Sequence, residues 1–407
     1  MVTTAPVLRP AGLNRPAPPS PLWLALLAAP VATGANAPVL ILPDIARSLG
    51  IHTAQATWIV TVFAWAMTVG TPLLGALVRQ RGLRATLLAS AVTAVGGTVL
   101  VALAPWFPLV LLGRAAQAAA GAGLVAVAMN LAGSTRRMGA VTAGFGVLGA
   151  MGPLLGSLLA QAVNWRAPLA LSALALLAVP AVWRHTGRDA AVPRGTTAFD
   201  AVGAGLVVAL ASALVLMPTA PLPGLLAAAV VVVPLVLHVR RRPDGFAPAA
   251  VLRSRTFIGS ALLAFVFSTS YFILLFALPE LVRRRTDWST AAIGTGQLVA
   301  LLTGSLLSWL LAAAANRLAH RKVLTVLVVL GTAAPLTAAL APWGPALLLA
   351  AAAAVFVATG SNAVLSVRTA QHASEAQRPS AISLFVLCYQ LGGALGPALA
   401  TVLVLNR

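Results

Sequence analysis

The sequence predicts an all-α integral membrane protein, and its composition and hydropathy carry that prediction. Hydrophobic residues make up 60% of the 407 residues, charged residues only 8%, and the mean hydropathy is +0.95. A soluble domain carries about a quarter charged residues. The chain therefore excludes soluble enzymes and secreted scaffolds, and we expect it to lie in a lipid bilayer.

Apolar runs long enough to cross the hydrocarbon recur along the whole chain. A helical span needs about 20 apolar residues. The first 20 residues are rich in proline, and the run after them is too long for a signal-peptide core, so we expect it to be retained as a span. Thirteen spans are predicted, at residues 21–43, 54–78, 85–104, 107–131, 138–162, 166–184, 200–218, 223–239, 256–280, 289–313, 323–341, 344–367 and 379–404.

The basic residues between the spans predict which side of the membrane each loop faces. With the N-terminus inside, the cytoplasmic segments hold 20 arginines and lysines and the outer segments hold 6. Loops rich in arginine and lysine stay on the cytoplasmic side. We therefore expect a cytoplasmic N-terminus, and the scattered basic residues account for the net charge of +20 without a nucleic-acid partner.

Two short motifs repeat at similar offsets, which predicts a duplicated helix bundle. Gly149–Pro153 (GAMGP) recurs as Gly393–Pro397 (GALGP), and the basic turn at 79–84 resembles the turn at 317–322. Transporters built from similar halves show such weak self-similarity, although short matches also arise by chance in a chain rich in glycine and alanine. The predicted parts are a cytoplasmic tail, a six-helix bundle, a linker with an inserted two-helix hairpin, and a second bundle, at residues 1–20, 21–184, 185–255 and 256–407.

Four motifs follow one another along the chain. They are LPDIARSLG at Leu42–Gly50, GALVRQRGLR at Gly75–Arg84, the arginine and glutamine of Arg114–Gln117, and GPLLG at Gly152–Gly156. In their order and spacing they resemble the major facilitator superfamily, and in particular its fourteen-span branch of multidrug–proton antiporters.

This resemblance implies a fold and a function. The fold is a two-bundle transporter, here with about thirteen transmembrane helices because the fourteen-span pattern lacks its last helix. The function is secondary active export of a small organic molecule, drug-like or metabolic, across the cell membrane by alternating access coupled to proton antiport. The expected partners are the substrate, protons and lipid, and the expected state is a monomer.

Arg114 is the strongest single candidate for a functional residue. A charged side chain inside an apolar span is costly unless it faces protein or water and finds acceptors. Gln117 lies one turn further along the same helix face. The resemblance implies that Arg114 lines the translocation path and takes part in proton coupling. The alternative is an arginine that reaches the membrane interface and only anchors the helix.

Other polar and aromatic residues at depth outline a predicted substrate cavity. A large, mostly apolar pocket with few fixed polar groups suits lipophilic or weakly acidic solutes. With an arginine and no acid at depth, an anionic or neutral substrate is favoured over a cation. The predicted substrate and coupling residues are Arg114, Gln117, Asn36, Tyr271 and Gln297.

The sequence offers no obvious proton carrier. The resemblance places an aspartate about nine residues before the Leu42-Pro43 pair, and Gly34 stands at that position. All seven acids fall at span ends or in loops, and Asp44 and Glu280 are the two closest to the path. The alternatives are a helix cap for Asp44 and an interfacial ion pair for Glu280. A coupling-deficient facilitator or an accessory membrane protein of the same fold is therefore the alternative function.

The loop between the second and third spans matches the family's gating loop at Gly75, Gly82 and Arg84. Arg79 stands where the family carries an aspartate, so the latch between the bundles is expected to be built differently or to be absent. The alternative is a plain basic cytoplasmic loop.

Small residues and a proline mark the fifth span at Gly149, Gly152, Pro153 and Gly156. Such spacing allows neighbouring helices to approach closely. The resemblance implies an antiporter of the exporting kind; the alternative is a close helix contact with no bearing on direction.

Enzyme chemistry is not expected. The one lysine, Lys322, follows no glycine-rich phosphate loop, and the one cysteine, Cys388, lies in an apolar run. No histidine, aspartate and glutamate cluster has metal-ligand spacing. We therefore expect no catalytic residue, no cofactor and no metal.

The predicted orientation can be tested with reporters. A reporter active only outside the cytoplasm, fused after Arg407, is expected to give signal, because thirteen crossings from a cytoplasmic N-terminus end outside. Signal from a cytoplasm-only reporter at the same position would contradict the thirteen-span prediction.

Overall fold

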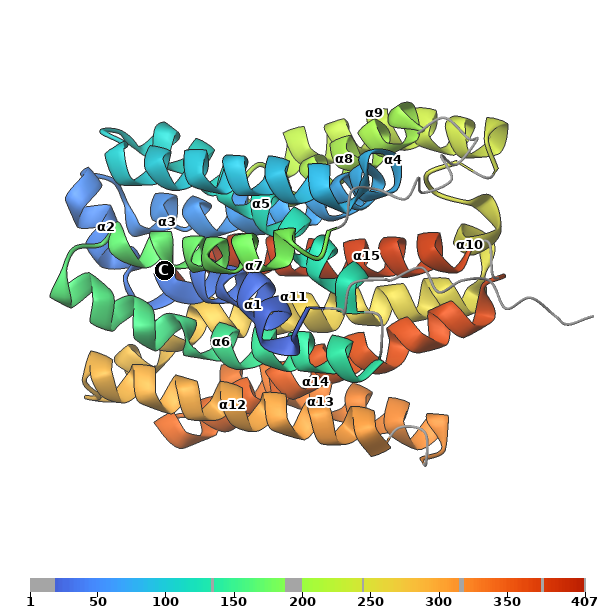
Figure 1. The fold of residues 1–407 in the computed structure, drawn as a ribbon. Coiled ribbons are helices and arrows are strands. Elements are labelled where there is room, and N and C mark those ends of the chain that lie inside the picture. The colour runs from blue at the N-terminus through green and yellow to red at the C-terminus, as the bar shows by residue number, and fades with distance from the viewer. Residues whose placement is uncertain are drawn as a thin grey trace, which may run out of the picture.

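The computed structural model describes residues 19–132, 135–186, 200–243, 245–314, 318–374 and 377–405, and these segments form helices joined by short turns (Figure 1). Eleven of the described helices are long and apolar enough to cross a membrane, and Ala167–Trp183 and Ala201–Leu216 are shorter apolar helices. Each predicted span overlaps one of these segments. The all-helical membrane fold is therefore confirmed, whereas the number of crossings and the orientation stay predictions.

In the N-terminal bundle, the first and the sixth predicted spans are each divided between two or more helical elements. Its elements are α1 (Pro21–Asn36), η1 (Ala37–Leu40), α2 (Leu42–Leu49), α3 (Thr53–Ala56), α4 (Trp58–Leu103), α5 (Phe107–Ala132), α6 (Thr135–Ala162), η2 (Ala167–Ala178) and α7 (Val179–Trp183). Pro38 and Pro43 lie in the first turns of η1 and α2, where a missing backbone N–H is tolerated. The first predicted span therefore divides into α1, η1 and the start of α2.

A single glycine reverses the chain inside α4. Gly82 has φ 82° and ψ 171°, which a residue with a side chain rarely adopts. The second and third predicted spans are therefore two helices that meet at this residue, and the label α4 covers both of them. The conformation gives a physical reason for the glycine at this place in the motif.

The remaining elements are the hairpin and the C-terminal bundle. The hairpin consists of α8 (Ala201–Leu216) and α9 (Pro221–Arg241). The C-terminal bundle consists of α10 (Ala249–Arg253), α11 (Arg255–Arg285), α12 (Thr290–Ala314), α13 (His320–Leu340), α14 (Gly344–His372), α15 (Arg378–Ala400) and the π-helix η3 (Thr401–Leu405).

The repeated glycine motif makes the same kind of contact in both bundles. In the first, α6 packs on α1, and a Cβ on Gly152 would lie 2.9 Å from the carbonyl oxygen of Thr33. In the second, α15 packs on α11, and a Cβ on Gly396 would lie 3.0 Å from the backbone nitrogen of Ile273. Both copies bring helix backbones together, as small residues do in membrane proteins.

The two bundles share one hydrophobic core at one end and have separate cores at the other. At the end that holds α2 and α3, on the left of Figure 1, residues of both bundles such as Ile45, Ile59 and Leu278 form one buried cluster. At the opposite end, Leu24 and Leu124 belong to an N-terminal cluster, and a second cluster belongs to α10, α11, α14 and α15. The bundles are therefore joined mainly at the end predicted to face outward.

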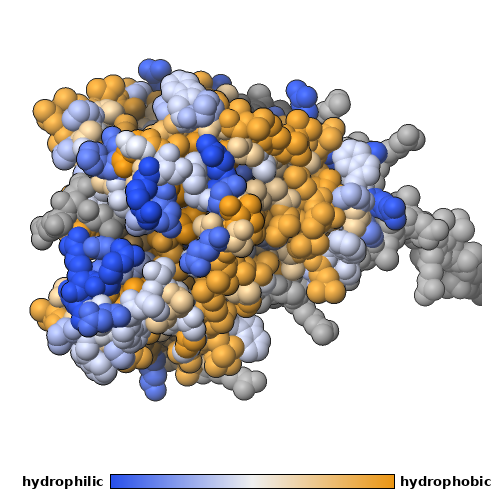
Figure 2. Space-filling view, turned by 90° about the vertical axis from the view of Figure 1, so that its left-hand side faces the viewer, coloured by the Kyte–Doolittle hydropathy of each residue, from blue (hydrophilic) through white to orange (hydrophobic). Residues whose placement is uncertain are grey.

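The surface is largely apolar. Many leucines and valines are exposed, for example Leu222 at 66% and Val230 at 73%. Figure 2 shows the left end of Figure 1, where hydrophilic side chains gather beside broad hydrophobic areas. Exposed apolar surface of this extent fits contact with lipid, and the hydrophilic patches fit one membrane–water interface.

The contact of α6 with α1 gives a stability prediction. A Cβ on Gly156 would overlap the carbonyl group of Ala37, whereas a Cβ on Gly146 of the same helix meets no atom within 4 Å. Gly156→Ala is expected to destabilise the protein by about 1–3 kcal/mol through overpacking. The control Gly146→Ala is expected to be neutral or slightly stabilising, because alanine favours helix. Thermal unfolding in detergent measures both, and equal melting temperatures would contradict this packing.

Candidate functional site

Arg114 lies inside the N-terminal bundle and is fully buried, with 0% of its surface exposed. Its Nη1 donates to Oε1 of Gln117 at 3.0 Å, and its Nη2 donates to the carbonyl oxygen of Gly34 at 3.0 Å. The guanidinium also lies over the ring of Phe63, 4.2 Å from its centroid. The side chain therefore points into the bundle and does not reach the membrane interface.

Gln117 fixes the position of the guanidinium. Its Nε2 donates to Oγ1 of Thr98 at 3.2 Å and to the carbonyl oxygen of Leu169 at 3.1 Å, while its Oε1 accepts from Arg114. The reversed amide would place N–H groups against the guanidinium, so the network admits one orientation. Segments α1, α4, α5 and η2 thus meet at one hydrogen-bonded cluster.

The carbonyl of Gly34 takes the place that a carboxylate would occupy as the partner of Arg114. A Cβ at residue 34 would lie 2.7 Å from Cβ and 2.8 Å from the backbone nitrogen of Ser172. Because the backbone of η2 fills this space, residue 34 cannot carry an acidic side chain without a shift of η2. Arg114 consequently has neutral hydrogen-bond partners, and its Nε lacks one among the described residues.

Asn36 lies near this cluster but belongs to the contact of α1 with α6. Its Nδ2 donates to the carbonyl oxygen of Gly149 at 3.0 Å, and a Cβ on Gly152 would lie 2.9 Å from its Cβ. Pro153 follows Gly152 inside α6. Asn36 and the glycines of the fifth span therefore form one helix–helix contact.

Tyr271 and Gln297 lie in the C-terminal bundle. Tyr271 on α11 is 8% exposed and belongs to the core that the bundles share. Gln297 on α12 is fully buried, and its Nε2 donates to the carbonyl oxygen of Leu275 at 2.9 Å. In the described segments, no hydrogen bond links either residue to Arg114. The predicted cavity residues are thus divided between the two bundles.

Asp44 and Glu280 lie at helix ends in ion pairs. Asp44 accepts from Arg47, and its side chain is 52% exposed. Glu280 accepts from Arg283 at 2.8 Å and from Arg284 at 2.6 Å. Pairs of this kind at a surface contribute about 0–1 kcal/mol. Neither carboxylate contacts the Arg114 cluster.

The gating-loop residues lie at the end of the bundle opposite α2. A Cβ on Gly75 would meet no atom within 4 Å, and Gly82 forms the bend of α4. The guanidinium of Arg84 lies 4.2 Å from the ring centroid of Trp183 on α7. The Arg79 side chain lies outside the described part of the structure. Arg84 thus contributes a cation–π contact that the motif alone does not predict.

One buried polar cluster at the hairpin was not predicted. Asp200, 8% exposed, accepts from His238 Nε2 at 2.7 Å, from Gly203 N–H at 2.9 Å and from Phe246 N–H at 3.0 Å. Burial alone raises the pKa of Asp200, but the hydrogen bonds from Phe246, Gly203 and His238 outweigh it and hold the pKa below its ordinary value. An aspartate just before an apolar run is a sequence signal for a helix N-cap. The partners His238 and Phe246, which are distant in sequence, have no such signal.

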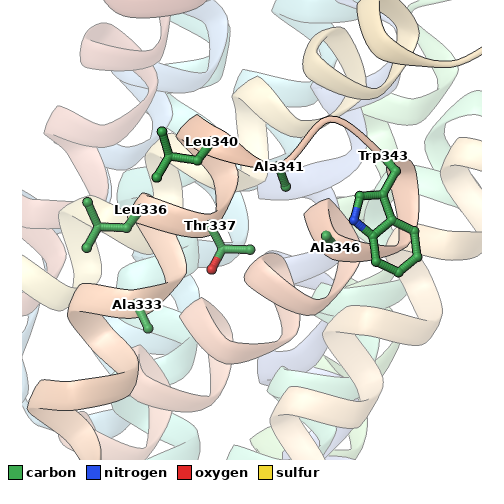
Figure 3. Close-up of a pocket in the computed structure, with 7 residues that line it drawn as sticks. All are labelled: Ala333, Leu336, Thr337, Leu340, Ala341, Trp343 and Ala346. Atoms are coloured by element: carbon green, nitrogen blue, oxygen red, sulfur yellow. The ribbon is translucent and has the colours of Figure 1, made fainter.

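A shallow apolar pocket lies apart from these clusters. It is formed at the turn between α13 and α14, with Trp343 on one side and Leu336 and Leu340 on the other (Figure 3). Its lining includes no acidic or basic side chain. It therefore adds nothing to the Arg114 cluster.

The Gln117 network gives a second stability prediction. Gln117→Leu removes the acceptor of Arg114 Nη1 and the bond to the carbonyl of Leu169, so a loss of about 1–3 kcal/mol is expected. Asn130→Leu is the control, because Asn130 lies on the same helix and, among the described residues, bonds to the carbonyl oxygen of Ala126 one turn earlier. Thermal unfolding in detergent measures both variants, and an equal effect would argue against the network.

Comparison with known proteins gives partial sequence matches. A chloramphenicol resistance protein of Streptomyces lividans is 32% identical over 194 residues, 46% of this chain and 48% of that protein. MFS transporter L2 of Phoma sp. is 30% identical over 152 residues, 36% of this chain and 25% of that protein. These matches span half or less of each relative's length.

Two solved structures are similar in fold over nearly the whole chain. The human organic anion transporter MFSD10 has a TM-score of 0.59 at 17% identity and covers 94% of this chain and 92% of its own. A bacterial homologue of the human lysosomal transporter Spinster, in an inward-facing and occupied conformation, has a TM-score of 0.62 at 16% identity, with 93% and 80% covered. The model of the Major Facilitator Superfamily matches residues 22–252 and 260–406. The chain therefore belongs to the Major Facilitator Superfamily.

Proposed function

We propose that this protein is a secondary transporter that exports a small organic molecule across the cell membrane by alternating access of its two bundles. The observation that carries the proposal is the buried guanidinium of Arg114, which has neutral partners and one unpaired N–H among the described residues. A buried cation without a counter-charge is costly in a membrane interior. A role in substrate binding or coupling accounts for its presence.

The arrangement of the hydrophobic cores fits one state of the proposed export cycle. The bundles share a core at the end predicted to face outward and have separate cores at the end predicted to face the cytoplasm. A state joined at the outer end is the one that receives solute from the cytoplasm in an alternating-access cycle. Export begins from such a state.

The polar groups of the two bundles favour an anionic or neutral substrate. Arg114 in the N-terminal bundle repels cations and offers an N–H donor. In the C-terminal bundle, Oε1 of Gln297 is buried without a partner in the described segments and offers an acceptor, and Tyr271 offers an aromatic surface. Gln117 and Asn36 act indirectly, because they hold Arg114 and α1 in place. The resistance protein of Streptomyces makes chloramphenicol a reasonable neutral probe.

The energy source distinguishes two candidate functions. Proton antiport would use Asp44 or Glu280, which lie in ion pairs at helix ends. The carbonyl of Gly34, which takes the place of a carboxylate beside Arg114, does not titrate near neutral pH. This substitution favours the second candidate, a facilitator of the same fold that moves solute without protons.

Uptake into inverted membrane vesicles tests Arg114. Labelled chloramphenicol serves as the neutral probe, fluorescein as the anion and rhodamine 123 as the cation. Arg114→Met is expected to reduce uptake of a transported anion at least tenfold, since one charge-assisted hydrogen bond is worth about 1.5–3 kcal/mol. Arg47→Met is the control, because the Arg47 side chain is 79% exposed. Equal uptake by both variants would exclude a role for Arg114.

A pH dye inside the same vesicles separates the two candidates. Antiport raises the internal pH as substrate enters, whereas a facilitator leaves it unchanged. Uptake of rhodamine 123 alone would contradict the anionic or neutral substrate.

A further inference from the structure

The inserted hairpin covers a seam between the two bundles. The seam is the line along which α4 of the N-terminal bundle meets α15 of the C-terminal bundle, and α8 contacts both helices. Ala211 and Val215 of α8 form a buried cluster with Leu391 and Ala394 of α15, and Trp65 of α4 packs against it. The hairpin is therefore a third body in contact with both halves of the transporter.

A single hydrogen bond joins the hairpin to the N-terminal bundle in the described residues. The indole Nε1 of Trp65 donates to Oγ of Ser212 at 2.9 Å, and that hydroxyl donates to the carbonyl oxygen of Val208 at 2.8 Å. The bond holds α8 at a defined height along α4. In an apolar environment the indole N–H has no water as a substitute partner.

The base of the hairpin is fixed to the C-terminal bundle. Asp200 gathers donors from the start of α8, from His238 of α9 and from Phe246 of the segment that leads into α10. That segment and α10 place Ala247 and Val251 in the core that contains Phe385 of α15. One carboxylate thus ties both hairpin helices to the segment that leads into α10.

A second hydrogen bond crosses the same seam at the end predicted to face outward. Oγ1 of Thr401 in η3 donates to Oγ1 of Thr57 at 2.8 Å, at the junction of α3 and α4. Both contacts thus bridge α4 to the C-terminal side of the seam. They are formed together in a state whose outer end is closed by a shared core.

We propose that the hairpin moves with the C-terminal bundle and that the Trp65–Ser212 bond is a positioning contact that stabilises the outward-closed state. This inference rests on the alternating-access function proposed above. When the bundles rock, α4 shifts against the hairpin and the seam. A hydrogen bond is lost beyond about 3.5 Å, so the contact favours the state in which it is formed. Neither residue is assigned to the substrate.

The effect is measured as a shift between two conformational states. Spin labels at Arg81→Cys and Arg321→Cys, both exposed, report the separation of the bundles at the cytoplasmic end, in a Cys388→Ser background and in lipid nanodiscs. Ser212→Ala and Trp65→Phe each remove one side of the bond. Each variant is expected to lower the ratio of long to short distances about fivefold. A change of this size corresponds to the free energy of one neutral hydrogen bond.

Three controls make the result specific. Ser308→Ala removes a buried hydroxyl that, in the described residues, bonds within α12 to the carbonyl oxygen of Ser305. It is expected to leave the ratio unchanged. The double variant of Trp65 and Ser212 is expected to shift the ratio no further than either single variant. Ser212→Thr keeps the hydroxyl and is expected to restore the ratio, which excludes misfolding as the cause.

A second pair of distances tests the movement of the hairpin. The labelled positions are Thr219→Cys at the exposed tip of the hairpin, Trp343→Cys in the C-terminal bundle and Trp106→Cys in the N-terminal bundle. The distance from 219 to 343 is expected to stay constant between states, and the distance from 219 to 106 to change. The reverse result would overturn the proposal.

The outcomes separate this inference from the proposed function. Two populations in the unmodified protein, with a ratio that Ser212→Ala does not change, would show that the contact has no positioning role. A single population under all conditions, together with no uptake of any probe, would instead remove the alternating-access function on which the inference rests.

Discussion

The absence of a side chain at Gly34 is the constraint on which the Arg114 cluster depends. Because α1 carries only hydrogen there, η2 packs directly on its backbone at Ser172 and the carbonyl of Gly34 remains free to accept from Arg114. The same approach brings the carbonyl of Leu169 to Gln117. A buried cation is thus held by dipoles from backbone and amide, where a carboxylate would otherwise be required.

The two bundles repeat a packing plan but differ in their polar chemistry. Glycines of α6 and α15 make equivalent contacts with α1 and α11. Among the described residues, the N-terminal bundle buries the charged side chain of Arg114. The C-terminal bundle buries the neutral side chains of Gln297 and Tyr271. The proposal of an anionic or neutral substrate rests on this difference between the two bundles.

Sequence periodicity and composition were sufficient for the fold but not for the partners within it. Apolar runs marked the long helices but not the short α2, α3 and α10. The spacing of Arg114 and Gln117 placed them on one helix face, where they do bond. Prolines alone did not predict where the first span divides. Pro38 and Pro43 lie at its division, but Pro30 and Pro153 lie inside continuous helices. The backbone acceptors of the cluster and the pairing of Asp200 with His238 depend on segments distant in sequence, and no local pattern encodes such contacts.

The shortness of α8 bears on how the hairpin enters the membrane. Its 16 residues extend about 24 Å, less than the roughly 30 Å of a hydrocarbon core, so α8 by itself is a weak stop for the insertion machinery. The 21-residue α9 is long enough to span. The set of hydrogen-bond donors to Asp200 is complete only once Phe246 has been synthesised. We therefore expect α8 to insert into the membrane together with α9 and not before it.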